Sequence, residues 1–167
     1  MKTGIIYISK HGTTEKVAKI IAEKLNSNEI ELINLRENQD YKIENFNRII
    51  IGGSIHIGSV YKKLKKLCES NESILTTKII GLFLCCAEKD EKAINQFDNS
   101  FSEILRLHAV STALLGYEFN FEKMNFIEKT IIKKISGIKE SISEIDYEMI
   151  GKFVNELEPK NITKIER

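Results

Sequence analysis

The sequence of 167 residues contains no tryptophan, one proline (Pro159) and three cysteines (Cys68, Cys85 and Cys86) without a Cys-x-x-Cys spacing. An odd number of cysteines with this spacing favours neither a disulfide framework nor a zinc site, and it is typical of a reducing compartment. The proline follows the last amphipathic pattern, so it marks no linker between domains. A chain of this length fits one domain, and we expect a single domain spanning residues 1–167.

The sequence also lacks an excess of one charge and lacks a long apolar run. Lys and Arg number 25 against 24 Asp and Glu, a net charge of +1, so no strong field attracts nucleic acid, and we expect no nucleic-acid partner. Apolar stretches such as residues 79–87 are much shorter than the ~20 residues of a membrane span. We see no signal peptide in the first residues. These observations predict a cytoplasmic protein.

Short apolar runs alternate with amphipathic stretches along the chain. The runs predict strands over residues 5–8, 31–35, 48–51, 79–86 and 109–117. Apolar residues at helical spacing predict helices over residues 14–26, 60–68, 94–105 and 149–157. Alternating strands and helices predict an α/β fold, with a parallel sheet covered on both faces. In such sheets ligands bind at the carboxyl ends of the strands.

Residues 120–144 form an insert that this alternation does not need. A connection between strand and helix usually takes about 2–6 residues. Within the insert, apolar residues recur at helical spacing with lysines beside them. The apolar residues are Met124, Ile127, Ile131, Ile132 and Ile135.

A turn rich in hydroxyl groups joins the first strand to the first helix. It consists of Ser9, Lys10, His11, Gly12, Thr13 and Thr14. Hydroxyls, backbone amides and a helix N-terminus together can hold a phosphate, although a threonine here can equally be a simple helix cap. The turn matches neither GxxxxGK[ST] nor GxGxxG. Ser9 and Ser54 stand where a receiver domain needs carboxylates, so phosphoacceptor signalling is not expected.

Two loops carry a resemblance to the flavodoxin superfamily. Ser9-x-x-Gly12-x-Thr14 resembles its phosphate loop, and residues 53–58, Gly-Ser-Ile-His-Ile-Gly, resemble its flavin-flanking loop. The latter loop, the late insert and the neutral charge are similar to the flavodoxin-like, menaquinone-linked protoporphyrinogen oxidases. The resemblance implies a three-layer sandwich with a five-stranded parallel sheet in the order 2-1-3-4-5. It also implies one non-covalently bound FMN, with its phosphate in the turn at residues 9–14.

The resemblance further implies that residues 54–59 flank one side of the flavin ring and residues 85–89 the other. The implied flavin-contacting residues are Ser54, Ile55, His56, Ile57, Gly58, Cys86, Ala87 and Glu88. Gly58 is the candidate for the glycine whose peptide flips near the reduced ring. The chain departs from free flavodoxins because these loops offer no tryptophan or tyrosine to stack on the ring. Cys85 and Cys86 are either small buried residues or redox thiols.

No metal ligand and no catalytic residue are assigned, since His11, His56 and His108 show no spacing of a metal site or triad. Two functions remain open: an oxidoreductase that passes electrons from a porphyrinogen-type substrate to a quinone, and an electron carrier that serves a redox partner protein. A third class is an α/β binding domain without FMN. Residues 122–136 either pack on the domain's own core, cover the flavin as a lid, or contact a partner or the inner face of a membrane.

Overall fold

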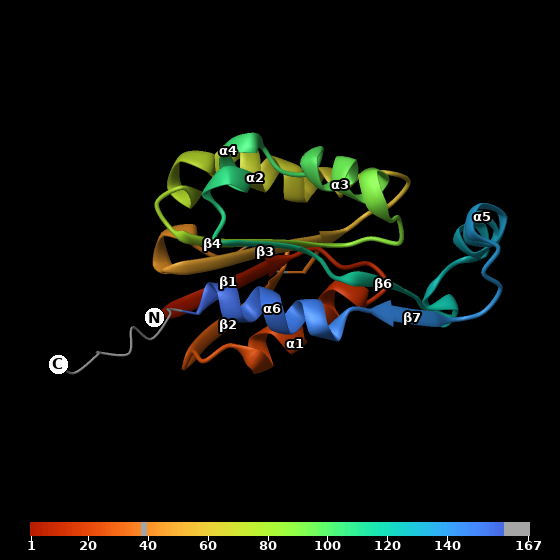
Figure 1. The fold of residues 1–167 in the computed structure, drawn as a ribbon, viewed down its shortest axis with the longest axis horizontal. Helices are drawn as coiled ribbons and strands as arrows, with labels where there is room; N and C mark the ends of the chain where they lie inside the picture. The colour runs from red at the N-terminus through yellow and green to blue at the C-terminus, as the bar shows by residue number, and fades with distance from the viewer. Residues whose placement is uncertain (38–39, 159–167) are drawn as a thin grey trace.

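In the computed structural model, which describes residues 1–37 and 40–158, the chain forms a three-layer α/β sandwich (Figure 1). Pro159 and the side chain of Ile135 lie outside the described part. The central sheet has the order β2-β1-β3-β4-β5, and all its pairs are parallel, as predicted. Its strands are β1 (Lys2–Tyr7), β2 (Glu29–Asn34), β3 (Arg48–Ser54), β4 (Ile79–Cys85) and β5 (Ser111–Leu114).

Helices cover both faces of this sheet, because successive strand residues point to opposite sides. On one face lie α1 (Thr13–Lys24) and α6 (Tyr147–Leu157), which pack on Ile5, Ile50 and Phe83. The other face carries α2 (Lys62–Leu75), α3 (Asp90–Asp98) and α4 (Glu103–His108). A short 3₁₀ turn, η1 (Ile43–Asn45), precedes β3. Apolar side chains on both faces explain why the central strands are uninterrupted apolar runs.

The single helix predicted over residues 94–105 is wrong, because the structure has two helices there. The first, α3, ends at Asp98, and Ser102 caps the start of α4 by accepting a hydrogen bond from the Leu105 amide at 3.3 Å. Phe97, Phe101 and Leu105 nevertheless pack in one core cluster. The apolar spacing therefore continues across the break, and this continuity concealed it.

The strand predicted over residues 109–117 is also wrong, because it is two strands separated by Leu115, and the chain turns away from the main sheet at Gly116. This glycine has φ +75°, a conformation that favours glycine. It starts β6 (Gly116–Phe119), which leaves the main sheet and pairs with β7 (Ile142–Ile145) in an antiparallel ribbon. The ribbon carries the insert beyond the end of the sheet (Figure 1).

Between the two strands of the ribbon lie a 3₁₀ turn, η2 (Phe121–Lys123), and the helix α5 (Phe126–Ser136). Met124 precedes this helix rather than belonging to it, which corrects the predicted apolar stripe. Neither core cluster contains a described residue of the stripe, and Ile127 is 68% exposed. Packing on the main core therefore does not explain the stripe. No helix in the described part is long and apolar enough to cross a membrane.

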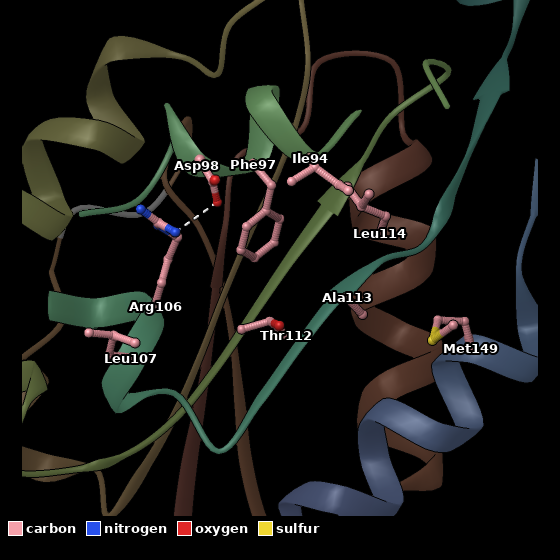
Figure 2. A pocket seen from close by; sticks show the side chains of 9 residues that line it. All are labelled: Ile94, Phe97, Asp98, Arg106, Leu107, Thr112, Ala113, Leu114 and Met149. Atoms are coloured by element: carbon pink, nitrogen blue, oxygen red, sulfur yellow. Dashed lines mark hydrogen bonds and ion pairs between the residues drawn. The ribbon is translucent and has the colours of Figure 1, made fainter. Parts of the chain in front are cut away.

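A hollow of about 500 Å³ opens beside β5, the edge strand (Figure 2). Its walls come from α3, α4, α6 and β5, and its charged groups are the ion-paired Asp98 and Arg106, with Nη1 and Oδ1 2.8 Å apart. It lies away from the loops that the sequence singles out, so it is not the candidate site.

Candidate functional site

A larger cavity, of about 590 Å³, lies at the carboxyl ends of β1, β3 and β4. This volume is typical of a pocket for a small organic ligand. Three loops and the insert meet around it. Most of the residues singled out in the sequence line the cavity: Ser9, Lys10, His11, Thr13, Thr14, Ser54, Ile55, His56, Ile57, Gly58, Ala87 and Glu88.

The first loop, residues 9–14, turns sharply into α1. Gly12 has φ +98°, and its amide donates to Ser9 Oγ at 3.2 Å, so it shapes the turn without lining the cavity. Gly12 also occupies the N-cap position of α1, and no side chain caps this helix among the described residues. The amides and the positive dipole end of α1 are therefore available to an anion.

The two threonines that begin α1 differ in their hydrogen bonds. Thr13 Oγ1 donates to the Glu118 carbonyl oxygen at 3.1 Å and so ties the loop to β6. Thr14 is fully buried and lines the cavity, yet its Oγ1 has no hydrogen-bond partner of normal geometry in the described part. A buried hydroxyl without a partner is rare in proteins, which indicates that a ligand atom supplies one here.

Basic side chains surround the same turn. Lys10 and His11 belong to it, and Arg36 Nη1 donates to the Ser9 carbonyl oxygen at 3.5 Å. The ammonium of Lys123, from the insert, lies over Gly12, 2.9 Å from where a Cβ would be. An L side chain at position 12 would therefore collide with this lysine as well as strain the backbone. The charges and the helix N-terminus together favour an anionic group.

The second loop, residues 54–58, forms a tight turn at the cavity. His56 and Ser59 exchange backbone hydrogen bonds of 2.8 and 3.2 Å, and the intervening Ile57 and Gly58 have φ +50° and +79°. This backbone is natural for Gly58 but strained for a β-branched isoleucine. Ile57 is also 92% exposed. Strain of this kind is concentrated at functional sites, so the loop is a candidate contact for the ligand.

His56 lies in the cavity wall, between the loops. Its Nε2 is hydrogen-bonded to Ser54 Oγ at 2.9 Å, and its ring lies 4.7 Å from that of Tyr61 and 5.8 Å from that of His11, measured between centroids. Burial, together with the charges of His11 and Lys10, lowers the pKa of His56 to about 4. The imidazole is therefore neutral near pH 7 and can serve as a hydrogen-bonding group without adding charge.

The third loop contributes a different cysteine from the one expected. Cys86 does not line the cavity; its thiol donates to Gln96 Oε1, 2.9 Å away, whereas Cys85 lines it. Neighbouring residues at the end of β4 point to opposite sides of the sheet, and the sequence alone did not determine which of the two cysteines faces the cavity. Burial raises the pKa of the Cys85 thiol to about 12, which favours the small buried residue over the redox thiol.

Aromatic side chains also reach the cavity, from elements that the sequence analysis did not assign to the site. They are Tyr61, before α2, and Tyr117 and Phe119, in β6. The ring centroids of Tyr117 and Phe119 lie 5.0 Å apart. Tyr117 and Phe119 are two residues apart, the spacing that places side chains on one face of a strand. The further residues missed in the lining are Gln96, Glu118, Glu128 and Ser136.

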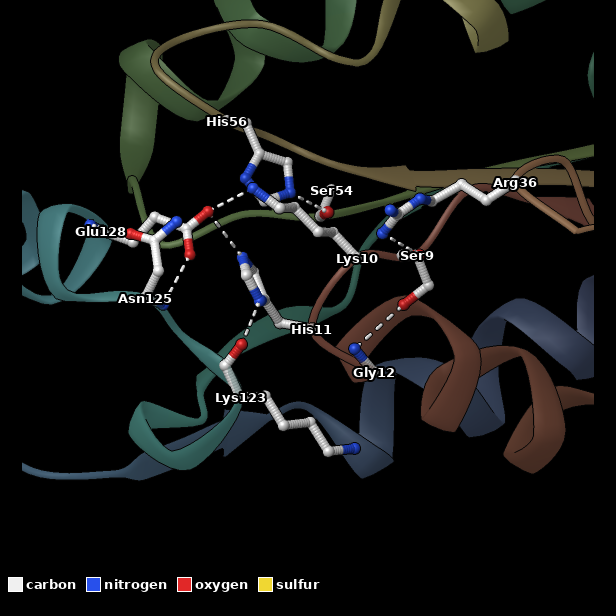
Figure 3. A network of polar contacts seen from close by, with 10 residues as sticks. All are labelled: Ser9, Lys10, His11, Gly12, Arg36, Ser54, His56, Lys123, Asn125 and Glu128. Carbon is white, nitrogen blue, oxygen red and sulfur yellow. Dashed lines mark hydrogen bonds and ion pairs between the residues drawn. The ribbon is translucent and has the colours of Figure 1, made fainter.

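The insert closes the remaining side of the cavity. Met124, Ile131 and Ile132 line it, so part of the predicted apolar stripe faces the ligand space rather than the main core. Glu128, in the first turn of α5, forms an ion pair with Lys10, and its Oε1 lies 3.4 Å from His11 Nε2 (Figure 3). The insert therefore contacts the first loop through opposite charges.

Comparison with known proteins agrees with this geometry. A curated relative, protoporphyrinogen IX dehydrogenase [quinone] of Escherichia coli (strain K12), is 24% identical, and the alignment covers 94% of each chain. Oxidised flavodoxin 1 from Bacillus cereus superposes with a TM-score of 0.57 at 22% identity, over 94% of this chain and 97% of that one. A Fusobacterium nucleatum flavodoxin bound to flavin mononucleotide gives a TM-score of 0.51 at 17% identity, with coverages of 94% and 97%.

These similarities extend across the loops that build the cavity. The model of one protein family, described as a flavodoxin domain, matches residues 4–146. That range includes most of β1, the other four strands of the main sheet, the three loops and the ribbon with its insert. The chain therefore belongs to the flavodoxin domain family.

Proposed function

We propose that this protein binds one FMN non-covalently in the 590 Å³ cavity and transfers electrons through it. The observation that carries the proposal is the fully buried Thr14 hydroxyl, without a hydrogen-bond partner of normal geometry in the described part, beside the start of α1, which no side chain caps there. A phosphate oxygen fits both features, because it accepts hydrogen bonds from hydroxyls and amides alike.

The rest of the cavity suits a flat, partly apolar ring system. Its lining combines the aromatic residues Tyr61, Tyr117 and Phe119 with isoleucines and a neutral histidine. The Fusobacterium flavodoxin with a similar fold is bound to FMN. When bound, FMN supplies the capacity to accept and release one or two electrons, which no side chain of the site offers.

We further infer that the protein is an oxidoreductase that passes electrons from a porphyrinogen-type substrate to a quinone-type acceptor. The support is the full-length similarity to a quinone-dependent protoporphyrinogen IX dehydrogenase, together with the insert that forms one wall of the cavity. Within this proposal, neutral His56 holds a hydrogen-bonding position for substrate, and the apolar Ile131 and Ile132 exclude water from that wall.

The outer face of the insert suits the surface of a membrane in which such a quinone dissolves. Phe126 is 83% and Ile127 68% exposed, and Lys133 and Lys134 are exposed on the same helix. Apolar and basic side chains on one helix are typical of contact with anionic lipid. We propose that α5 contacts the inner face of the membrane. Co-sedimentation with anionic vesicles should decrease in a Phe126→Ser, Ile127→Ser variant and should be absent with zwitterionic vesicles. Equal sedimentation of wild type and variant would contradict this contact.

The cofactor is tested by titrating the flavin-free protein with FMN and with riboflavin while following flavin fluorescence. We expect FMN to bind at least tenfold more tightly, since only FMN has the phosphate that the first loop would hold, and a charge-assisted hydrogen bond contributes about 1.5–3 kcal/mol. Equal affinities would show that the first loop does not hold a phosphate. The absence of binding by either flavin would overturn the proposal.

The role of the insert is tested by removing it at the ribbon. Phe119 and Ile142 pair across the two strands, so residues 120–141 can be replaced by Asn-Gly, which forms a two-residue hairpin turn. We expect FMN to remain bound, because the phosphate loop is retained, while electron transfer to a quinone falls sharply. Retained transfer to a quinone would show that the insert is not needed for the quinone reaction. That result would favour the electron-carrier function, which assigns the insert no quinone acceptor.

A further inference from the structure

Glu128 is the acidic group that joins the insert to the basic first loop. Its Oε1 takes part in the ion pair with Lys10 and lies 3.4 Å from His11 Nε2. Lys10 holds the pKa of the Glu128 carboxyl below its usual value, which indicates that the carboxylate is charged at neutral pH. Figure 3 shows this carboxylate between the insert and the loop, facing the side chains of Lys10 and His11.

The carboxylate is held in place from its own helix. Asn125 and Glu128 form a capping box: the Asn125 backbone N–H donates to Glu128 Oε2 at 3.0 Å, and the Glu128 backbone N–H donates to Asn125 Oδ1 at 2.9 Å. One carboxylate oxygen therefore fixes the start of α5, and the other faces the first loop. Because the capping box already restricts the Glu128 side chain, the contact of its carboxylate with Lys10 and His11 costs little further side-chain entropy.

Lys10 and His11 also belong to the loop that would hold a phosphate. Lys10 and His11 lie between Ser9 and Gly12, within the turn whose helix amides and Thr14 hydroxyl can bind an anion. A phosphate group and the Glu128 carboxylate are both negatively charged, so they repel each other and compete for the Lys10 ammonium and for hydrogen bonding by the His11 ring. An anion at the loop and a closed contact of α5 therefore oppose each other.

We propose that Glu128 determines how strongly the site discriminates between phosphate-bearing and uncharged ligands, by acting as an internal anion that a phosphate must displace from Lys10 and His11. Its displacement releases α5 from the first loop. The inference about flavin selectivity rests on the proposed function. The inference about competition for Lys10 and His11 applies to any phosphate anion.

The selectivity is tested with Glu128→Gln. Glutamine retains the capping box, so the variant removes the charge without removing the helix cap. The matched control is Glu140→Gln, which removes the charge of an exposed glutamate in the same insert. We expect Glu128→Gln to strengthen FMN binding roughly tenfold and to change riboflavin binding by less than a factor of two, with Glu140→Gln resembling wild type. Weaker FMN binding in Glu128→Gln, or equal gains for both flavins or both variants, would overturn the proposal.

The release of α5 is tested separately, with trypsin and inorganic phosphate on the flavin-free protein. Lys129, Lys133 and Lys134 place trypsin sites in α5, and cleavage there requires the helix to open. We expect phosphate to accelerate cleavage of the wild-type insert relative to chloride at equal ionic strength. Glu128→Gln should be cleaved faster from the start and be insensitive to phosphate. Protection of the wild-type insert by phosphate, or no effect of it, would overturn the competition. This result stands even if no flavin binds, so it separates failure of this inference from failure of the proposed function.

Discussion

Replacing Thr14 with valine should stabilise the flavin-free protein and weaken its binding of FMN at the same time. Valine has nearly the shape of threonine but lacks the hydroxyl. In the structure that hydroxyl is fully buried, and apart from a weak contact with the Cys85 thiol it has no hydrogen-bond partner of normal geometry in the described part. An unsatisfied buried polar group costs roughly 1–3 kcal/mol, so its removal should raise the free energy of unfolding by about 1 kcal/mol.

The loss in binding follows from the same atom. A hydrogen bond to a charged group contributes about 1.5–3 kcal/mol, so the Thr14→Val protein should bind FMN roughly 10- to 150-fold more weakly. Riboflavin, which has no phosphate, should be bound as before. Urea denaturation of the flavin-free protein and fluorescence titration with each flavin measure the two effects.

Thr13→Val is the matched control, because the Thr13 hydroxyl already donates to the Glu118 carbonyl oxygen at 3.1 Å. Its removal leaves that oxygen without this donor and should destabilise the flavin-free protein by about 1 kcal/mol, the opposite sign. The reasoning would be refuted by a Thr14→Val protein less stable than wild type, or by one that binds FMN with unchanged affinity.

Further predictions concern pH, backbone and thiols. The pKa of His56 is about 4 in the folded protein and 6.5 in the unfolded one, so the unfolded state binds more protons between these pH values. The free energy of unfolding should therefore fall as the pH drops through this window, by at most about 3 kcal/mol. Urea denaturation at pH 7 and 4.5 should show a smaller fall for His56→Gln than for wild type. Gly116→Ala should lower the unfolding free energy by more than about 2 kcal/mol, because φ is +75° and the new Cβ would lie 1.9 Å from a carbonyl oxygen of β7. Gly151→Ala, in α6 with no atom within 4 Å of the new Cβ, should raise it by about 0.5–1 kcal/mol, and thermal denaturation checks both signs. Since burial raises the pKa of both Cys68 and Cys85 to about 12, iodoacetamide at pH 8 should label them only after unfolding, and mass spectrometry of labelled peptides would reveal any exception.

The sequence was sufficient for the main sheet because the strands that build it are buried on both faces. Ile49, Ile50 and Ile51 face alternate core clusters, and a short β-branched run of this kind is typical of a central strand in a parallel sheet. The turn at residues 9–14 was equally visible, since its glycine and hydroxyls stand directly between a strand and a helix. Local chemistry and the global fold agree at these positions.

The rest of the site depends on contacts distant in sequence, and the sequence alone could not provide them. Glu128 and Lys10 are far apart along the chain and meet only because the ribbon folds the insert back. The aromatic side chains of Tyr117 and Phe119 face the cavity because Gly116 redirects the strand, and a glycine in a strand pattern does not specify its φ. The absence of stacking residues, inferred from the loops alone, was therefore wrong for the cavity as a whole.

The pairing of Gly116 with Ile145 has a consequence for how this protein can diversify. These two residues are paired partners at one end of the β6–β7 ribbon, so the segment between them is a long loop whose two ends are held together. Doubling the length of such a loop adds only about 0.6 kcal/mol of closure entropy. One insert can therefore be exchanged for another while the main sheet and its covering helices keep their sequence and their stability.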